Sequence, residues 1–375
     1  MWKRYLGLAV VLTCNPSAVF AQNAAAVFAQ NTSAVFVQTG PSVSHYYIFD
    51  VGPIVGDLTL SRLNQGGQMI WNSGGHAYVY QNCTSRDLGN LGGGQSVAND
   101  INSNGVVVGK SKQSSGRWRA FSYSNGAMHD LGGSTNSLIW EEATAINFWG
   151  DVVGVESVQG TLSPTGVRYQ NGGTSVMARF LVIPPSGWGF VTNVTAITDS
   201  EDVVGYVWQG GASTALLSTN FGYQWTKLNG VPGLEFATFP RAMNRYSHVA
   251  GEAGQGLVRA FISRDPASPA ADLGTLGGTL SGGYGINNYD WVVGWAEATN
   301  GGGPRAFVHD GTRMTDLNSI LWNPGGWLLR EADAVNDAGQ IVGSGVLNGQ
   351  EHAFFLQPMS RPPQFLPCGI VAEAQ

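Results

Sequence analysis

The chain has 375 residues, of which 53 are glycine and 16 proline, and charged residues make up only 12%. Lysine occurs at only four positions, which argues against a largely helical protein and favours strands joined by turns. The formal net charge is −6 and no run of clustered Lys and Arg occurs, so the composition argues against nucleic acid as a partner.

The N-terminal sequence predicts export. Lys3 and Arg4 precede a short apolar stretch, residues 5–13, and Ala21 supplies the small residue that signal cleavage needs. The apolar stretch is too short to cross a hydrocarbon core of about 30 Å, so no transmembrane segment is predicted. We expect residues 1–21 to be a secretory signal and the protein to be secreted or periplasmic. Val11–Cys14 faintly resembles a lipoprotein box, so a lipid anchor is the alternative.

The segments at the two ends of the mature chain differ from the rest. Residues 22–45 continue an eight-residue repeat that begins near Ser17, and this repeat makes Ala29 a second candidate cleavage point. We expect residues 22–45 to form a disordered linker. Residues 358–375 form a C-terminal tail that contains proline.

Between these segments the chain is a tandem array. Its unit is an apolar residue, Asn, two turn residues, often Gly, then a β-branched pair and Gly, as in Ile101–Gly109 and Ile146–Gly154. Seven copies begin at residues 63, 101, 146, 197, 243, 286 and 335, with a mean step of roughly 45 residues, which is typical of four-stranded propeller blades. A helical solenoid would need a 3.6-residue period, which is missing.

Each copy continues with the same two signals. A strand of the type His/Arg-Ala-Phe comes first, as in Arg119–Phe121, and Asp-Leu-Gly or a relative follows, as in Asp130–Gly132. These residues resemble the HAF repeat family of probable extracellular bacterial proteins, named for His-Ala-Phe. The resemblance covers residues 46–357 and is loosest near residues 166–182. It implies a secreted repeat protein with a propeller-like fold, and it supplies no active-site motif.

The repeat predicts an all-β, seven-bladed β-propeller over residues 46–357. The residues before each Ile-Asn are small, as the crowded innermost strand of a blade requires. The last copy lacks an Asp-Leu-Gly strand, whereas Tyr46–Gly52, before the first copy, contains an additional strand of this type. We therefore predict that Tyr46–Gly52 pairs with His352–Leu356 and closes the ring. Asn-x-x-Gly suits the tight turn between the first two strands. Glu201, Ser247 and Asp290 replace that Gly, so these turns should be strained or differently built.

The two cysteines of the mature chain, Cys83 and Cys368, permit one disulfide. Propeller geometry puts Cys83, in the turn after the third strand of blade 1, on the face where the C-terminal tail leaves blade 7. We therefore predict a Cys83–Cys368 bridge across the seam.

No catalytic or cofactor motif survives inspection. Gly105–Ser111 resembles a phosphate-binding loop but has three residues between its glycines where four are required. The six histidines do not cluster, His76 and His352 occupy one repeat position, and neither a metal nor a cofactor is predicted.

The loops that lead from the fourth strand of one blade to the first strand of the next should share one face, and they are rich in aromatic residues. Candidate ligand-binding residues there are Trp140, Trp188, Phe190, Phe236, Trp322, Trp327 and Arg330. Trp beside carboxylates can stack sugar rings and hydrogen-bond their hydroxyls, but these aromatics could equally fill the spaces between blades. If the protein is an enzyme, the residues to test are Glu141, Glu142, Glu331, Asp333 and Arg241; a glycosidase needs two carboxyls roughly 5–9.5 Å apart.

Two functions follow from this pattern. The first is a non-enzymatic, monomeric binding protein whose loop-bearing face takes an extracellular polymer (a polysaccharide) or a protein. The alternative is an extracellular polysaccharide-active hydrolase or lyase with its site at the mouth of the channel.

Overall fold

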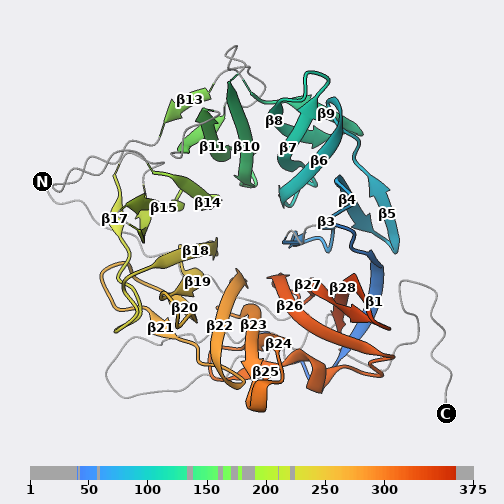
Figure 1. Ribbon diagram of the computed structural model, residues 1–375, viewed down its shortest axis with the longest axis vertical. Helices are drawn as coiled ribbons and strands as arrows, with labels where there is room; N and C mark the ends of the chain where they lie inside the picture. Colours follow the sequence, from blue (N-terminus) through green and yellow to red (C-terminus); the bar gives the residue numbers. More distant parts are fainter. Residues whose placement is uncertain are drawn as a thin grey trace, which may run out of the picture. The chain divides into compact units, whose positions relative to one another are not determined.

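The computed structural model describes residues 40, 43–56, 60–132, 138–158, 164–169, 176–179, 191–209, 211–219 and 224–359. These residues form seven four-stranded antiparallel sheets, together with the short 3-10 helices Thr299–Gly301 and Leu317–Ile320. The sheets are arranged around a central axis with the first strand of each blade innermost (Figure 1). The predicted all-β, seven-bladed propeller is confirmed.

Six blades are consecutive in sequence. Blade 1 comprises β2 (Arg62–Leu63), β3 (Met69–Ser73), β4 (His76–Gln81) and β5 (Thr84–Asp87), and blade 2 comprises β6 (Gly92–Ile101), β7 (Val107–Gln113), β8 (Trp118–Ser124) and β9 (Ala127–Asp130). Blade 3 comprises β10 (Ile139–Ile146), β11 (Val152–Val158), β12 (Thr165–Tyr169) and β13 (Val176–Arg179), and blade 4 comprises β14 (Asn193–Ile197), β15 (Val203–Gln209), β16 (Ala212–Ser218) and β17 (Thr226–Lys227). Blade 5 comprises β18 (Thr238–Met243), β19 (Val249–Ala253), β20 (Arg259–Ser263) and β21 (Ala271–Asp272), and blade 6 comprises β22 (Gly277–Ile286), β23 (Val292–Ala298), β24 (Pro304–His309) and β25 (Met314–Asp316).

Blade 7 joins the two ends of the array. It combines β26 (Trp327–Val335), β27 (Ile341–Leu347) and β28 (Gln350–Pro358) with β1 (Tyr46–Pro53) as its outer strand. Ile48 pairs with Leu356 and Phe49 with Phe355, so the predicted closure is confirmed. In Figure 1 the blue strand β1 accordingly lies in the red blade.

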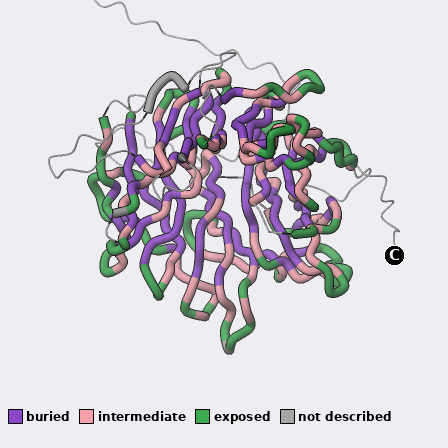
Figure 2. Tube along the Cα trace, turned by 45° about the horizontal axis from the view of Figure 1, so that its top comes forward, coloured by how far each residue is buried: buried purple, intermediate pink, exposed green. Residues whose placement is uncertain are grey.

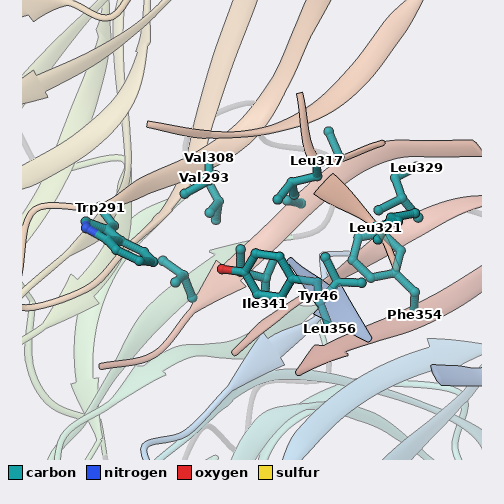
Figure 3. Packing of buried hydrophobic residues seen from close by; sticks show 13 residues of the cluster. Tyr46, Trp291, Val293, Val308, Leu317, Leu321, Leu329, Ile341, Phe354 and Leu356 are labelled. Carbon is teal, nitrogen blue, oxygen red and sulfur yellow. The ribbon is translucent and has the colours of Figure 1, made fainter. Parts of the chain in front are cut away.

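The hydrophobic core lies between blades. Buried residues follow the strands, whereas exposed residues concentrate in the turns and loops (Figure 2). Between blades 6 and 7, Tyr46 and Phe354 pack with Trp291, Leu317 and other buried side chains (Figure 3). The Tyr46 hydroxyl also donates to Gly339 O at 3.0 Å. The closing strand is thus held by side-chain packing as well as by backbone pairing.

The His/Arg-Ala-Phe and Asp-Leu-Gly signals belong to one interaction within the blade. Ala120 and Phe121 are fully buried, as are their equivalents in blades 5, 6 and 7. The Arg119 side chain reaches Asp130 of the fourth strand, Nε to Oδ1 at 3.1 Å, and the His76–Asp87 and His352–Asp50 pairs repeat this arrangement at 2.8 Å. The repeat histidines are therefore part of the scaffold.

A second repeated feature explains the glycine that ends Val-Val-Gly. The innermost strands of blades 2–7 each carry a β-bulge shortly before the repeat Asn. The bulge presses the inner strand against its neighbour. A Cβ on Gly109 would lie 2.0 Å from Val97 O, and one on Gly154 would lie 2.0 Å from Glu142 O. Only glycine fits opposite the bulge.

The three turns that lack the expected glycine keep its backbone conformation. Glu201, Ser247 and Asp290 have φ of 64°, 60° and 61°, in the left-handed region that a side chain disfavours. These turns are therefore strained, as predicted.

Candidate functional site

The bulges of the innermost strands supply the side chains of the central channel. In blades 3–7 the extra residue lies two positions before the apolar residue that opens the repeat, and the residue after it is Ala or Gly. A bulge turns such a side chain out of the sheet. Together with Arg62 of blade 1, one side chain from each blade faces the axis. These residues are Asn99, Thr144, Thr195, Arg241, Tyr284 and Asp333.

These side chains line two cavities that share Arg62, Thr144, Thr195 and Arg241. The upper cavity, of about 340 Å³, lies toward the start of the inner strands and is also lined by Leu60, Asn99, Glu142 and Asn193. The lower cavity, of about 160 Å³, lies further along the same strands and includes Asp100, Tyr284 and Asp333. Because the inner strands begin where the interblade loops arrive, the upper cavity is on the loop-bearing side of the ring.

Carboxyl groups collect around the lower cavity. Burial raises the pKa of Asp100, although the backbone N–H groups of Ile101 and Ile146 donate to its two oxygens, each at 2.9 Å. Burial, and then the nearby Glu331, hold the pKa of Asp333 well above its usual range. Asp333 is only 3% exposed, and its Oδ2 accepts from Ser61 N at 2.8 Å. Its Oδ1 has no hydrogen-bond partner among the described residues.

The basic side chains of the channel differ in how they are held. Arg241 binds Glu252 through Nη2 at 2.7 Å and Nε at 3.2 Å. Burial alone would lower the pKa of Arg241, but Glu252 raises it. Arg62, at the junction of the two cavities, has a pKa that burial lowers, and its one side-chain hydrogen bond among the described residues runs from Nη1 to Ser61 O at 3.2 Å.

An aromatic shelf, formed by Tyr206, Trp208 and Phe239, adjoins the upper cavity. Trp208 stacks on Phe239 with ring centroids 6.0 Å apart, and Tyr206 meets Phe239 edge-on at 5.5 Å. Asn193, which lines the upper cavity, donates from Nδ2 to the Tyr206 hydroxyl at 3.1 Å. Trp208 is 52% exposed, so the shelf offers a flat apolar surface to a ligand.

Four of the five acid–base candidates lie at or beside the channel, and the fifth, Glu141, does not. Glu142, Asp333 and Arg241 line the channel cavities, and Glu331 lies close to Glu252 and Tyr284 beside them, with a pKa that burial and Glu252 raise. The Glu142 carboxylate forms an ion pair with Lys110, Oε2 to Nζ at 3.0 Å.

Glu141 has a different environment. It is fully buried and ion-paired with Arg119, Oε2 to Nη1 at 2.7 Å, and it lines neither cavity of the channel. Glu141 therefore joins blade 3 to blade 2 as part of the scaffold.

The aromatic candidates from the interblade loops do not converge on the channel. Trp140 lines a separate cavity of about 490 Å³ with Trp118. Trp327 packs edge-on against Phe354 at 6.2 Å, and Arg330 is paired with Glu351 at 2.6 Å. Phe236 and Trp322 are exposed, and Trp188 and Phe190 lie outside the described residues.

Cys83 is disulfide-bonded. Its predicted partner, Cys368, lies outside the described residues, so the pairing stays a prediction.

Sequence reasoning missed Arg62 and the aromatic shelf. The shelf residues lie on strands rather than in loops: Tyr206 and Trp208 follow the repeat Gly205, and Phe239 precedes a bulge. A usable signal was present in the pattern small–variable–small before the repeat Asn, as in Gly283-Tyr284-Gly285. The variable residue is the one that faces the channel.

Comparison with known proteins bears on the fold. No family profile and no curated protein sequence matches the chain. Its structure is similar to that of a puromycin-hydrolysing peptidase from Mycobacterium tuberculosis, with 12% identity and a TM-score of 0.51 over 88% of this chain and 56% of the peptidase. It also matches TolB from Acinetobacter baumannii, with 15% identity and a TM-score of 0.41 over 56% of this chain and 52% of TolB. A third match is YCF48 bound to D1 peptide, with 10% identity and a TM-score of 0.46 over 85% of this chain and 99% of YCF48.

The chain spans about half the length of TolB and of the peptidase. At 12% identity the likeness to the peptidase shows the propeller fold alone. In the part of the chain that the structure describes, no helix is long and apolar enough to span a membrane.

Proposed function

We propose that the protein is an exported, HAF-repeat propeller that binds an extracellular polysaccharide at the mouth of its central channel. Export is supported by the leader-like residues 1–21 and by the disulfide at Cys83, since disulfides persist in oxidising compartments. Binding is supported by one observation above all. An exposed aromatic shelf adjoins, through Asn193, a cavity of about 340 Å³ that has polar side chains in its lining and lies on the loop-bearing side of the ring.

This combination suits a sugar better than an apolar ligand. A pyranose ring has an apolar face, which packs on an aromatic ring, and a rim of hydroxyls that need hydrogen-bond partners. The shelf offers Trp208 and Phe239 for the face. The Asn99 and Asn193 side-chain oxygens and the Thr195 hydroxyl offer acceptors for the rim. Asn99 Nδ2 itself donates to Glu142 and Ala143, and Asn193 Nδ2 donates to Tyr206. The volume of the cavity falls within the range of small-molecule sites, about 300–1,000 Å³.

The test measures binding of the mature protein to a panel of polysaccharides by affinity electrophoresis, with Phe239→Ala as the shelf variant. We expect the variant to lower the affinity at least about 10-fold, because an aromatic contact of this kind is worth roughly 1 kcal/mol beyond its buried area. Trp149→Ala is the matched control. Trp149 is 67% exposed on the turn between β10 and β11, at the opposite end of the inner strand from the loops. Equal retention of both variants would refute the site.

A second function, polysaccharide cleavage, has one observation in its favour. Asp333 and Glu331 are close to each other in a buried region next to a cavity, and both have raised pKa values, as a general acid requires. The same panel distinguishes the two functions if new chain ends are scored alongside retention. Cleavage that Glu331→Gln and Asp333→Asn both abolish would establish the enzyme. We expect retention without cleavage.

A further inference from the structure

Arg62 differs from the other basic side chains around the channel, Lys110 and Arg241, in having no fixed counter-ion. Lys110 is paired with Glu142, and Arg241 with Glu252. Arg62 forms no ion pair among the described residues, and its Nη1 bond to Ser61 O, at 3.2 Å, is a long one. A guanidinium carries five N–H donors. Most of the donors of Arg62 therefore have no acceptor among the described residues, and Arg62 lines both cavities.

None of the carboxyl groups near Arg62 forms a hydrogen bond with it among the described residues, and three of the four oxygens of Asp100 and Asp333 accept backbone N–H groups instead. Both oxygens of Asp100 accept backbone N–H groups, and Oδ2 of Asp333 accepts the N–H of Ser61. Their charges act on Arg62 only through space. This long-range attraction makes a buried cation tolerable without giving it a hydrogen-bonded partner, so the planar edge of the guanidinium remains open to a ligand.

We infer that Arg62 receives the acidic group of an anionic sugar, a carboxylate or a sulfate ester, so that the ligand of the channel mouth is an acidic polysaccharide. This inference rests on the proposed function, because it needs the sugar ring on the aromatic shelf. Arginine suits the task since its fork of donors matches a planar or tetrahedral oxyanion with two parallel bonds.

Arg241 connects the shelf, on blades 4 and 5, to the cavities that Arg62 lines from blade 1. Phe239 and Arg241 are two residues apart on β18, about 7 Å along a strand. Arg241 in turn lines both cavities together with Arg62. A ring stacked at the shelf can therefore direct its acidic substituent, or that of the next ring, into the upper cavity.

The recognition is local. The chain carries a net charge of −6, so its overall field repels a polyanion rather than attracting it. Selectivity for an acidic sugar must then come from the Arg62 guanidinium at the channel. A single contact of this kind predicts a shallow dependence of affinity on salt, unlike the steep dependence that many Lys and Arg contacts produce with nucleic acid.

The experiment measures the affinity of the mature protein by calorimetry for three probes: a uronic-acid oligomer, the same oligomer with its carboxyl groups reduced to alcohols, and a sulfated oligomer of similar length. We expect the uronate to bind about 10- to 100-fold more tightly than its reduced form, since hydrogen bonds to charged groups contribute about 1.5–3 kcal/mol. Arg62→Gln should remove this difference and leave the affinity for the reduced oligomer unchanged. The third probe distinguishes a carboxylate from a sulfate as the preferred group.

Binding of the reduced oligomer by Arg62→Gln shows that the variant is folded, and Arg313→Gln, an exposed arginine in the turn between β24 and β25, controls for the change in net charge. Equal affinity for the uronate and its reduced form would overturn the inference while leaving the proposed function intact, provided that Phe239→Ala weakens both. Loss of both ligands in Arg62→Gln would assign Arg62 a structural role. Binding of an acidic peptide in preference to every oligomer would overturn both proposals.

Discussion

The Nδ2 atom of Asn336 in blade 7 donates to the backbone O of Asn64 in blade 1 at 3.1 Å, and so joins the end of the array to its beginning. Asn64 repeats the bond to Asn102, and Asn102 to Asn147, at 2.9 and 3.0 Å. Six such links pass around the channel. The repeat Asn therefore ties neighbouring blades together, in addition to shaping its own turn.

Asn336→Ala should destabilise the propeller by about 2–4 kcal/mol. The substitution removes a buried bond from Nδ2 to Asn64 O. It also removes two partly buried bonds, from Nδ2 to Gln340 Oε1 and from Gln340 N to Asn336 Oδ1. Denaturant unfolding measures the loss. Asn104→Ala is the matched control, because the Nδ2 of Asn104 also donates to the next blade, to Phe148 O at 2.9 Å, but is exposed. A cost for Asn104→Ala as large as that for Asn336→Ala would show that burial is not what makes the ring bonds matter.

The ring lacks one link, and that gap can be filled. Thr198 stands at the Asn position of blade 4 and accepts the link from Asn147, but its hydroxyl bonds with Ser200 and accepts from Asp202 N instead of reaching Asn244. Thr198→Asn should add the seventh link and raise the free energy of unfolding by about 0.5–1.5 kcal/mol. Thermal unfolding tests the gain, and an unchanged or lower midpoint would contradict it.

The sequence was sufficient for the architecture because each blade repeats the same local signals. Strand count, blade count and closure by Tyr46–Gly52 all follow from patterns that can be read within one copy or by comparing copies, and the structure extends the closing strand to Pro53. The interblade role of the Asn side chain could not be read in this way. Its acceptor lies in the next copy, about 45 residues away, and only the ring geometry brings the two together.

The site was harder to predict than the fold, because it depends on which way adjacent residues of a strand point. Glu141 and Glu142 are neighbours on β10 and both reach blade 2, but Glu141 is fully buried against Arg119, whereas Glu142, paired with Lys110, lines the upper cavity of the channel. A one-residue bulge reverses the alternation of side chains further along the strand. Sequence analysis therefore identified Glu142, Asp333 and Arg241 without being able to separate them from Glu141.

Gly109→Ala should unfold or severely destabilise blade 2, at a cost of about 3 kcal/mol or more. The new Cβ would lie 2.0 Å from Val97 O, and the inner strand cannot withdraw from the close contact that its bulge creates. Gly66→Ala is the control, because a Cβ there meets nothing nearer than 3.4 Å and the backbone needs no left-handed conformation. Soluble yield and thermal midpoint measure both variants. A well-folded Gly109→Ala would mean that the bulge is not required for the blade.

Asp333→Asn should stabilise the protein at pH 8 more than at pH 4. Burial, followed by the charge of Glu331, raises the pKa of Asp333, so folding favours its protonated form. A carboxyl with a raised pKa contributes stability in full below its unfolded pKa of about 4, and loses that contribution as the pH rises through the folded value. Asparagine keeps an acceptor for Ser61 N and carries no charge. We therefore expect Asp333→Asn to raise the free energy of unfolding by about 1 kcal/mol at pH 8 and to change it little at pH 4. A pKa shift of one unit corresponds to about 1.4 kcal/mol.

Asp310→Asn provides a control of opposite sign. Partial burial would raise the pKa of Asp310, but hydrogen bonds from Thr312 and the N–H of Arg313 lower it, so its ionised form stabilises the fold above about pH 4. Removing that charge should lower stability at pH 8. Denaturant unfolding of both variants at the two pH values measures the contrast. If Asp333→Asn instead lowered stability at pH 8, the ionised form of Asp333 would be stabilising there. It would then act as a counter-ion to Arg62, and the guanidinium would be less free to bind an acidic ligand.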